Sequence, residues 1–409
     1  MSPLFSCTNA YTNGRKVSKA YFNGTNLCQD AFSTPGLIPP GAVGTAIIEI
    51  DTRLYRREST FGTGSVDPTN REFSIAIQNY STPDIGAGKP AIVIDWGDNT
   101  VFTGTSRGVD TRGTTIGRSG GNIFDHTYPS PGVYTVTFSN LSKNGCSFSS
   151  SSSGSFSFQS IGAQYQECFK TVRFENNTWR FRKSTSNRSL FRDCINLTSF
   201  TAPTIDPIDG GSPFLRVSSL DGGAFTNCSS LTSFPFINTS NITQYIGTWS
   251  GCSSLSNFPN NLDFTNSTVL RSTFKGLPIT SWNCNGRITA FDLRGCWENC
   301  TNLVDFPANK FDGPLRTVTF FTREPDGTFT FGSRIQEYNT NAFERTFKNC
   351  ALSPQSIENI LTSLVTGGAT NITLSLEGGT NAVASTWTGS AIAAYNTLIS
   401  RGWTITRNA

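Results

Sequence analysis

The chain has 409 residues, enough for roughly two or three domains that each bury a core of their own. Hydrophobic residues make up 36% of it and charged residues only 15%, a composition that excludes an intrinsically disordered chain. The net charge of +4 is spread along the chain without a Lys/Arg block, which argues against nucleic-acid binding. The single histidine argues against most His-dependent catalytic and metal sites.

Ser, Thr and Asn must cover much of the surface, which favours β-structure and turns over long helices. The first residues, MSPLFSCTNAYTNGRKVSK, lack the apolar core of a secretory signal peptide. No run approaches the roughly 18 apolar residues of a membrane span. We therefore expect the chain to fold in the cytoplasm where it is made and to have no membrane partner.

Residues 1–44 predict a small anchoring region. KVSKAYFNGTNLC indicates a β-hairpin, because Asn23-Gly24 between two strand-like runs is a strong signal for a two-residue turn. TPGLIPPG follows, and its prolines are typical of a linker.

Residues 45–145 alternate apolar and polar side chains, which is typical of half-buried strands. The strand-like segments are TAIIEID, REFSIAIQNY, PAIVIDWGD, NIFDHTY and GVYTVTFSN. Short strands at this spacing, separated by Gly, Pro and Asn, predict an antiparallel β-sandwich.

Part of this region resembles the PKD family, whose fold is an immunoglobulin-like β-sandwich. The resemblance rests on IDWGDNT at residues 94–100, followed by FDHTYPSPGVYTVTFS at residues 124–139. Asn99 stands where the family usually has Gly, and because Asn tolerates a left-handed backbone the tight turn is retained. The SFSSSSSGSFSF segment that comes next predicts either a flexible linker or a serine-rich strand.

From about residue 160 to 350 one phrase recurs, aromatic-x-x-Cys-x-x-Leu-x-x-Phe, often followed by Pro. FTNCSSLTSFP, WSGCSSLSNFP and WENCTNLVDFP are three of its spellings. The underlying unit is about 24 residues long, a length at which one unit buries its hydrophobic side only by stacking on its neighbours. Leu277 fills the cysteine position of one unit, and the others hold Cys168, Cys194, Cys228, Cys252, Cys300 and Cys350.

Disulfides, a zinc site and interior packing are the three interpretations of this recurring cysteine. The total of 11 cysteines is odd and a secretion signal is lacking, which argues against a disulfide framework. Zinc requires paired spacings, and Cys296-x3-Cys300 without a nearby His is a weak match. Leucine at position 277 is compatible with a packing role for this position but not with a disulfide or a metal ligand. We therefore expect the six cysteines to form a buried structural ladder. The other cysteines have no assigned role: Cys7, Cys28, Cys146, Cys284 and Cys296.

The recurring phrase, with NTSNIT at residues 238–243 between two units, closely resembles the BspA-type leucine-rich repeat. Such repeats occur in bacterial surface adhesins and in structural proteins of tailed phages. The resemblance implies a leucine-rich-repeat solenoid over residues 146–350 that is used for binding and not for catalysis.

Residues 351–409 predict an α/β cap that covers the end of the solenoid. LSPQSIENILTSLVTGG indicates a helix that Ser353 caps, Pro354 begins and Gly367-Gly368 ends. Its apolar face holds Ile357, Ile360, Leu361 and Leu364. NITLSLEGG, GSAIAAYNTLISRG and WTITRN then predict a strand, a second helix and a last strand. Similar endings accompany repeats of this kind in virion proteins of phages that infect cyanobacteria.

Two insertions lengthen the repeats, one between residues 203 and 223 and one at residues 317–333. TVTFFTREPDGTFTFGS predicts a hairpin with its turn at PDG. It either projects from the solenoid as a partner contact or folds back over a local apolar patch. The candidate contact residues are Val318, Phe320, Asp326, Phe329 and Phe331.

Asp95, Asp98 and Asp125 gather near His126 in the PKD-like motif. An acid–base or calcium site is one interpretation. We favour the other, in which the carboxylates cap the tight turn and His126 packs beside Tyr128. The sequence contains no nucleophile elbow, P-loop or dinucleotide motif. We therefore expect no catalytic, cofactor or metal site and no enzyme activity.

Together these regions predict a multi-domain, mainly β protein. Such domains normally work outside a cell, and a virus particle assembled in the cytoplasm and released by lysis reconciles this with the missing signal. We expect a structural protein of a tailed-phage virion, resembling those of cyanophages and displayed as a tail fibre, adhesin or capsid decoration. Its partners would be other virion proteins through residues 1–44 and a host-surface glycan or protein, with homo-oligomerisation left open. A bacterial surface adhesin and a polysaccharide depolymerase are the alternatives.

Overall fold

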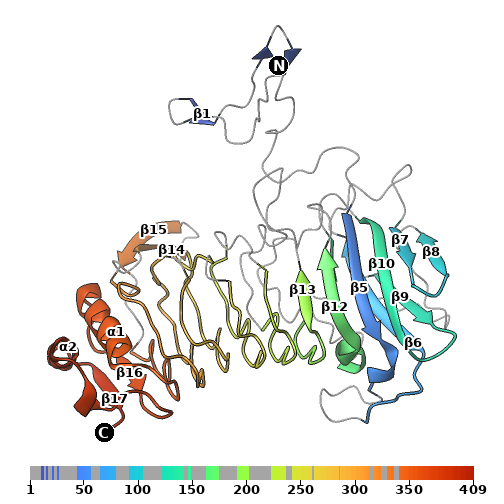
Figure 1. The fold of residues 1–409 in the computed structure, drawn as a ribbon. Coiled ribbons are helices and arrows are strands. Elements are labelled where there is room, and N and C mark those ends of the chain that lie inside the picture. Colours follow the sequence, from blue (N-terminus) through green and yellow to red (C-terminus); the bar gives the residue numbers. More distant parts are fainter. Residues whose placement is uncertain are drawn as a thin grey trace.

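The computed structural model is mainly β, with two α-helices among the residues that it describes (Figure 1). The described residues are 11–12, 15–16, 21–22, 25–26, 44–56, 65–79, 92–104, 122–141, 146–148, 163–174, 191–201, 223–235, 242–259, 262–284, 286–312, 317–323, 329–335 and 340–409. None of the described helices is long and apolar enough to cross a membrane.

Near the N-terminus the structure contains two small hairpins. β3 (Tyr21–Phe22) pairs with β4 (Thr25–Asn26), and Phe22 opposite Thr25 leaves two residues between the strands, which confirms the hairpin predicted around Asn-Gly. β1 (Tyr11–Thr12) and β2 (Arg15–Lys16) pair in the same way. Sequence analysis missed this second hairpin, although it carries the same Asn-Gly signal. The Pro-rich linker lies outside the described residues.

A six-stranded sheet in the order β13-β12-β5-β10-β7-β8 forms one end of the protein. Its strands are β5 (Gly44–Asp51), β7 (Ile92–Asp95), β8 (Val101–Gly104), β10 (Val133–Leu141), β12 (Phe169–Phe174) and β13 (Ser199–Thr201). Burial alternates along β5, where Ala46, Ile48 and Ile50 are buried, as a strand with one face on the core requires. Most of the pairs are antiparallel, but β12 and β13 are parallel.

A three-stranded sheet in the order β11-β6-β9 packs against this sheet. Its strands are β6 (Glu72–Asn79), β9 (Asn122–Thr127) and β11 (Cys146–Phe148). Phe73 of β6 meets Phe169 of β12 edge-to-face, with ring centroids 5.7 Å apart, so the two sheets share a core. We call them the two-sheet region. β11 extends it into the start of the serine-rich segment, whose residues 149–158 lie outside the described part of the chain.

From Phe191 onward the chain forms successive units that stack side by side (Figure 1). In each unit the backbone N–H of the aromatic residue donates to a carbonyl of the next unit, as from Phe225 to Thr248 at 2.8 Å and from Trp249 to Thr273 at 3.0 Å. Parallel bridges such as Ser233–Asn257 join the short extended segments. We call residues 191–350 the repeat stack.

In each unit from Phe191 onward, the residue before the cysteine position has a left-handed backbone. Asp193, Asn227, Asn299 and Asn349 have φ between 59° and 64°, and Gly251 has a φ of 77°. Asn, Asp and Gly adopt this conformation more readily than other residues, which explains why the phrase reads Asn-Cys, Asp-Cys or Gly-Cys. The Asn side chains also link units, since the amide of Asn227 donates to the Asp193 carboxylate at 2.8 Å.

The predicted insertion at residues 317–333 contains a hairpin, β14 (Thr317–Arg323) paired with β15 (Phe329–Ile335). It is inserted between two adjacent units, because the N–H of Trp297 still donates to the carbonyl of Thr346 at 3.0 Å. Asp326 lies outside the described residues, and so do the side chains of Val318, Phe320, Phe329 and Phe331.

The C-terminal elements agree with the sequence analysis: α1 (Pro354–Gly367), β16 (Thr373–Leu376), α2 (Gly389–Ser400) and β17 (Thr404–Arg407). Ser353 caps α1 by accepting from the N–H of Ser356, and Gly368 ends it with a φ of 78°. β16 pairs in parallel with β17 and bridges the last unit through Phe343 and Leu374. The short 3₁₀ helices are η1 (Thr52–Leu54), η3 (Ala163–Cys168) and η4 (Ala384–Thr386).

Candidate functional site

The interior of the repeat stack is built from aromatic columns. Rings of successive units stack on one another, as Trp249 does on Phe274 at 5.7 Å and 7°, and Trp297 on Phe347 at 5.2 Å and 3°. The second aromatic of each unit meets this column edge-on, as Phe258 does against Trp249 at 82°. Stacked and edge-on rings are the favoured aromatic geometries, so each unit adds the same contacts to one continuous core.

All six cysteines of the expected ladder are buried, with exposed fractions of 0%. Four of their thiols, those of Cys228, Cys252, Cys300 and Cys350, also donate hydrogen bonds, which packing alone does not explain. The thiol of Cys252 donates to the carbonyl of Phe225 at 3.1 Å, and that of Cys300 donates to Phe274 at 3.0 Å. Each of these carbonyls lies one unit earlier, at the aromatic position. Cysteine therefore acts as a small side chain and as a hydrogen-bond donor between units.

The thiol is a second donor to a carbonyl that is already bonded. The carbonyl of Phe225 accepts from the N–H of Cys228 at 3.2 Å as well as from the thiol of Cys252. Leu277 has no thiol to donate to the Trp249 carbonyl of the preceding unit. That carbonyl still accepts from the N–H of Cys252 at 3.2 Å, and Leu277 is fully buried. Because one donor remains, the apolar side chain is tolerated at this position.

Burial raises the pKa of five ladder thiols, those of Cys168, Cys194, Cys228, Cys300 and Cys350. The pKa of Cys300 rises to about 12, and those of Cys194, Cys228 and Cys350 rise well above the ordinary value, in each case because burial disfavours the thiolate. A protonated thiol retains the S–H that it donates, and it is a poor nucleophile and metal ligand. All eight cysteines whose side chains the structure describes are free and buried.

A second buried column lies one residue before the aromatic of each unit. It contains Ala224, Thr248, Thr273, Cys296 and Thr346. The hydroxyl of Thr346 donates to the Leu293 carbonyl at 2.9 Å, so this column also links units by hydrogen bonds. Cys296, which had no role in the sequence analysis, belongs here. Cys284 lies elsewhere, and its thiol donates to the Pro259 carbonyl at 3.5 Å.

The carboxylates near His126 stabilise a turn, as predicted. Asp95 accepts from the N–H of Gly97 at 2.9 Å, and Asp98 accepts from the N–H of Thr100 at 3.1 Å. His126 lies 2.8 Å from Asp98. Burial would raise the pKa of Asp98, but hydrogen bonds from Thr100 and His126 outweigh it and lower the pKa.

The aromatic neighbours of His126 also agree with the prediction. Its ring meets Tyr128 edge-on at 4.5 Å and stacks on Trp96 at 4.8 Å. The side chain of Asp125 lies outside the described residues. Among the residues that are described, no group of three or more His, Cys, Asp and Glu side chains is arranged to hold a metal ion.

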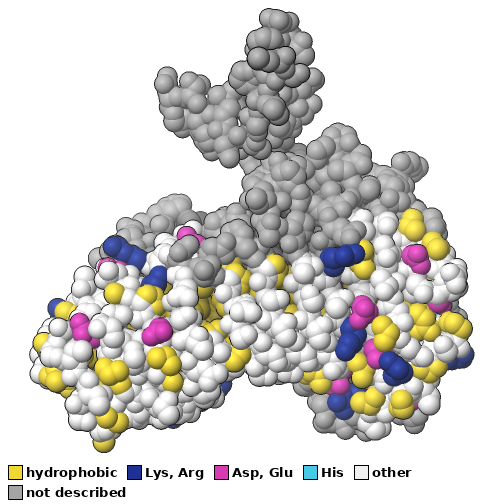
Figure 2. Space-filling view, viewed as in Figure 1, with side chains coloured by type: hydrophobic (Ala, Val, Ile, Leu, Met, Phe, Trp, Pro, Cys, Tyr) yellow, Lys and Arg dark blue, Asp and Glu magenta, His cyan; other side chains and the backbone are white. Residues whose placement is uncertain are grey.

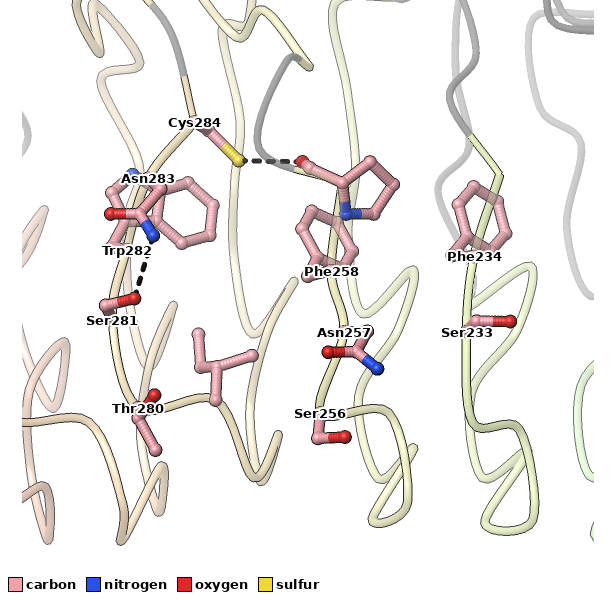
Figure 3. Close-up of a pocket in the computed structure, with 12 residues that line it drawn as sticks. Ser233, Phe234, Ser256, Asn257, Phe258, Thr280, Ser281, Trp282, Asn283 and Cys284 are labelled. Carbon is pink, nitrogen blue, oxygen red and sulfur yellow. Dashed lines mark hydrogen bonds between the residues drawn. The ribbon is translucent and has the colours of Figure 1, made fainter.

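The candidate binding site is a groove of about 480 Å³ over three neighbouring units of the repeat stack (Figure 3). The groove takes equivalent residues from each unit, because the units are in register. Its lining residues are Ser233, Phe234, Ser256, Asn257, Phe258, Pro259, Ile279, Thr280, Ser281, Trp282, Asn283 and Cys284. Its volume is within the range of small-molecule sites.

The exposed lining of the groove is polar and uncharged. Ser233, Ser256, Asn257 and Thr280 are exposed and make no side-chain hydrogen bond to another described residue. Asn283 donates to the hydroxyl of Ser281 at 2.8 Å, which fixes its amide (Figure 3). The groove therefore offers free hydroxyl and amide groups on a rigid frame.

Aromatic rings form the floor of the groove. Phe234 and Trp282 are buried, whereas Phe258 and Pro259 are partly exposed. Phe258 stacks on Trp282 with ring centroids 6.2 Å apart, so its position is set by the core. The sequence analysis missed this groove, although its signal is visible in the polar residues of SLTSFP, SLSNFP and PITSWN.

Comparison with known proteins gives no relative for this chain: no family model, no curated protein and no solved structure matches it.

Proposed function

We propose that this chain is a non-enzymatic structural protein of a tailed-phage virion, displayed on the particle surface and binding a host or virion component there. In this proposal the two-sheet region is an immunoglobulin-like, PKD-type sandwich. The repeat stack is a BspA-type leucine-rich-repeat solenoid, and residues 351–409 are its cap.

One observation carries the proposal: the repeated reactive groups are inside the stack. The ladder thiols are buried, and four of them donate to backbone carbonyls. The repeated residues therefore stabilise the interior of the stack. The exposed residues that line the groove are neutral Ser, Thr and Asn. A rigid frame with a polar exterior suits display and binding better than covalent chemistry.

The ends of the frame support the same function. β12 and β13 connect the first unit of the stack to the six-stranded sheet, while α1 and α2 lie at the other end (Figure 1). Both ends are therefore covered, as a stack of repeats requires if it is not to aggregate. The paired strands β1–β4 precede this body and are the proposed attachment to the particle.

Mass spectrometry of purified virions of the phage that encodes the chain tests the proposal. The protein should co-purify with particles, and antibody labelling should place residues 191–350 on their outside. Deletion of residues 1–44 should remove the protein from the particles while the remainder stays folded. A protein that is found on the surface of a bacterium and never in particles is an adhesin, and the proposal is then wrong.

A further inference from the structure

We propose that the groove over Ser233, Asn257 and Ser281 binds a neutral, hydroxyl-rich saccharide chain that lies across the three units. This inference deepens the proposed function, since it names the class of ligand that the displayed stack would bind. It rests on the chemistry of the groove, which holds wherever the protein is located.

The spacing of the groove residues suits an extended ligand. Ser233 pairs with Asn257 in a parallel bridge, so equivalent side chains of adjacent units stand about 4.8 Å apart. The first and third units are therefore about 10 Å apart. Figure 3 shows Ser233, Asn257 and Ser281 at the same level on the three units, with Phe234, Phe258 and Trp282 beside them. A short oligosaccharide running along the stack meets the same polar groups at each step.

The hydrogen-bonding groups match those of a sugar. The free hydroxyls of Ser233, Ser256 and Thr280 both donate and accept, and the amide of Asn257 supplies separate donor and acceptor atoms. Sugar hydroxyls have the same dual capacity. The partly exposed faces of Phe258 and Pro259 provide an apolar surface for the C–H face of a sugar ring. A few polar groups around an apolar floor are typical of a small-molecule site.

Charge decides which saccharide class fits. None of the twelve lining residues is charged. Asp305, which pairs with Ser281 on the next unit, is exposed and places a negative charge beside one end of the groove. Figure 2 shows that charged side chains on the drawn face are scattered and that the middle of the stack is largely uncharged. The cation beside the groove is Lys310, and its ammonium already donates to the backbone carbonyls of Cys284 at 2.7 Å and Gly286 at 3.0 Å. Uronic, sialylated or sulfated chains would compete with those bonds, so a neutral chain is favoured.

A protein partner fits the groove less well. Stable protein interfaces bury about 800 Å² on each side and rely on exposed aromatic or Arg anchors. This groove has a volume of about 480 Å³, and Trp282 in its floor is buried. The described residues of the groove therefore provide hydrogen bonds and one partly exposed ring, which is the pattern of a small polar ligand.

The test is an array of neutral hexose, hexosamine and deoxyhexose oligosaccharides, with matched uronic, sialylated and sulfated members, probed with the full chain. We expect binding to neutral members only. Asn257→Ala should weaken that binding about threefold to tenfold, the loss of one or two hydrogen bonds. Ser254→Ala, an exposed residue in a turn of the same unit, is the matched control and should bind as the wild type does.

Asn257→Arg separates the remaining possibilities. It places a long cation in the groove, so it should abolish neutral binding, and circular dichroism should show that the variant is folded. If acidic saccharides are the ligand, Asn257→Arg will tighten their binding and the inference is wrong. Binding to no saccharide, or equal binding by Asn257→Ala and wild type, also overturns it. Saccharide binding by a protein that is absent from virions would overturn the proposed function and leave this inference standing.

Discussion

Replacing Cys252 tests whether the recurring thiol is a hydrogen-bond donor or only a filler. Cys252→Ala removes one fully buried sulfur atom. The lost transfer free energy is about 0.8 kcal/mol and the small cavity adds about 0.5 kcal/mol. The lost bond to the Phe225 carbonyl adds about 0.5 kcal/mol, for a destabilisation of about 2 kcal/mol. Cys252→Ser keeps a donor of similar shape, so it should cost about 1 kcal/mol or less.

Urea unfolding under reducing conditions, followed by fluorescence of the buried Trp249, Trp282 and Trp297, measures both variants. At a urea dependence of about 2 kcal/mol per molar, Cys252→Ala should lower the midpoint by about 1 M. Ser254→Ala in the same unit is the control and should not shift it. If the position were only an apolar slot, the serine hydroxyl would be buried unpaired and Cys252→Ser would be less stable than Cys252→Ala. That order would refute the donor interpretation.

Three further predictions concern the backbone of Gly251, the ion pairs of Asp292 and the accessibility of the ladder thiols. Gly251→Ala should lower stability by about 1–2 kcal/mol in a thermal unfolding scan, because φ is 77° and the new Cβ would lie 2.5 Å from Oδ1 of Asn227; unchanged stability would contradict this. Burial would raise the pKa of Asp292, but hydrogen bonds from Arg294 and Arg271 outweigh it and lower the pKa. Its folded pKa is therefore below the unfolded value, so the carboxylate stabilises the protein above about pH 3.8 and this contribution is lost as the pH falls through the folded pKa. Asp292→Asn should flatten the acid side of the stability profile, and an unchanged profile would count against the ion pairs. The six ladder thiols should resist maleimide in the native protein and react after unfolding, as measured by peptide mass spectrometry; rapid native labelling would show that they are accessible.

Local signals explain which parts of the fold could be predicted from the sequence. The hairpin of β3 and β4, the cap at Ser353 and the end of α1 at Gly368 each depend on a few adjacent residues with strong backbone preferences. The cysteine positions were found because their residue type and spacing recur. The second buried column was missed because its residue type varies among Ala, Thr and Cys, so no one residue type marks every unit.

Contacts between distant residues explain the rest. The donation from Cys252 to Phe225 depends on a distance across units, and the same cysteine would fit an apolar slot equally well. The groove was missed because its exposed Ser and Asn side chains contribute to binding only when three units are in register. The pairing of β12 with β5 joins segments that are far apart in the sequence, and no turn signal connects them.

That pairing makes the two-sheet region an N-terminal cap of the repeat stack. β12 pairs with β5 on one side and with β13 on the other, so the first strand of the stack, β13, is hydrogen-bonded to the sheet through β12. Repeats gain stability from their neighbours, so loosening the sheet should loosen the first units. Ile48→Ala in β5 removes a fully buried side chain and should cost about 3 kcal/mol.

Hydrogen exchange measured by mass spectrometry locates the effect of Ile48→Ala. If the sheet caps the stack, amides of residues 191–201 and 223–235 should exchange at least tenfold faster, and those of α1 should change little because they lie at the other end. The matched control is Leu361→Ala in α1, which also removes a fully buried side chain and should show the opposite distribution. Faster exchange confined to the two-sheet region would mean that the pairing of β12 with β13 does not couple the stability of the stack to that of the sheet. The stack would then fold without the sheet.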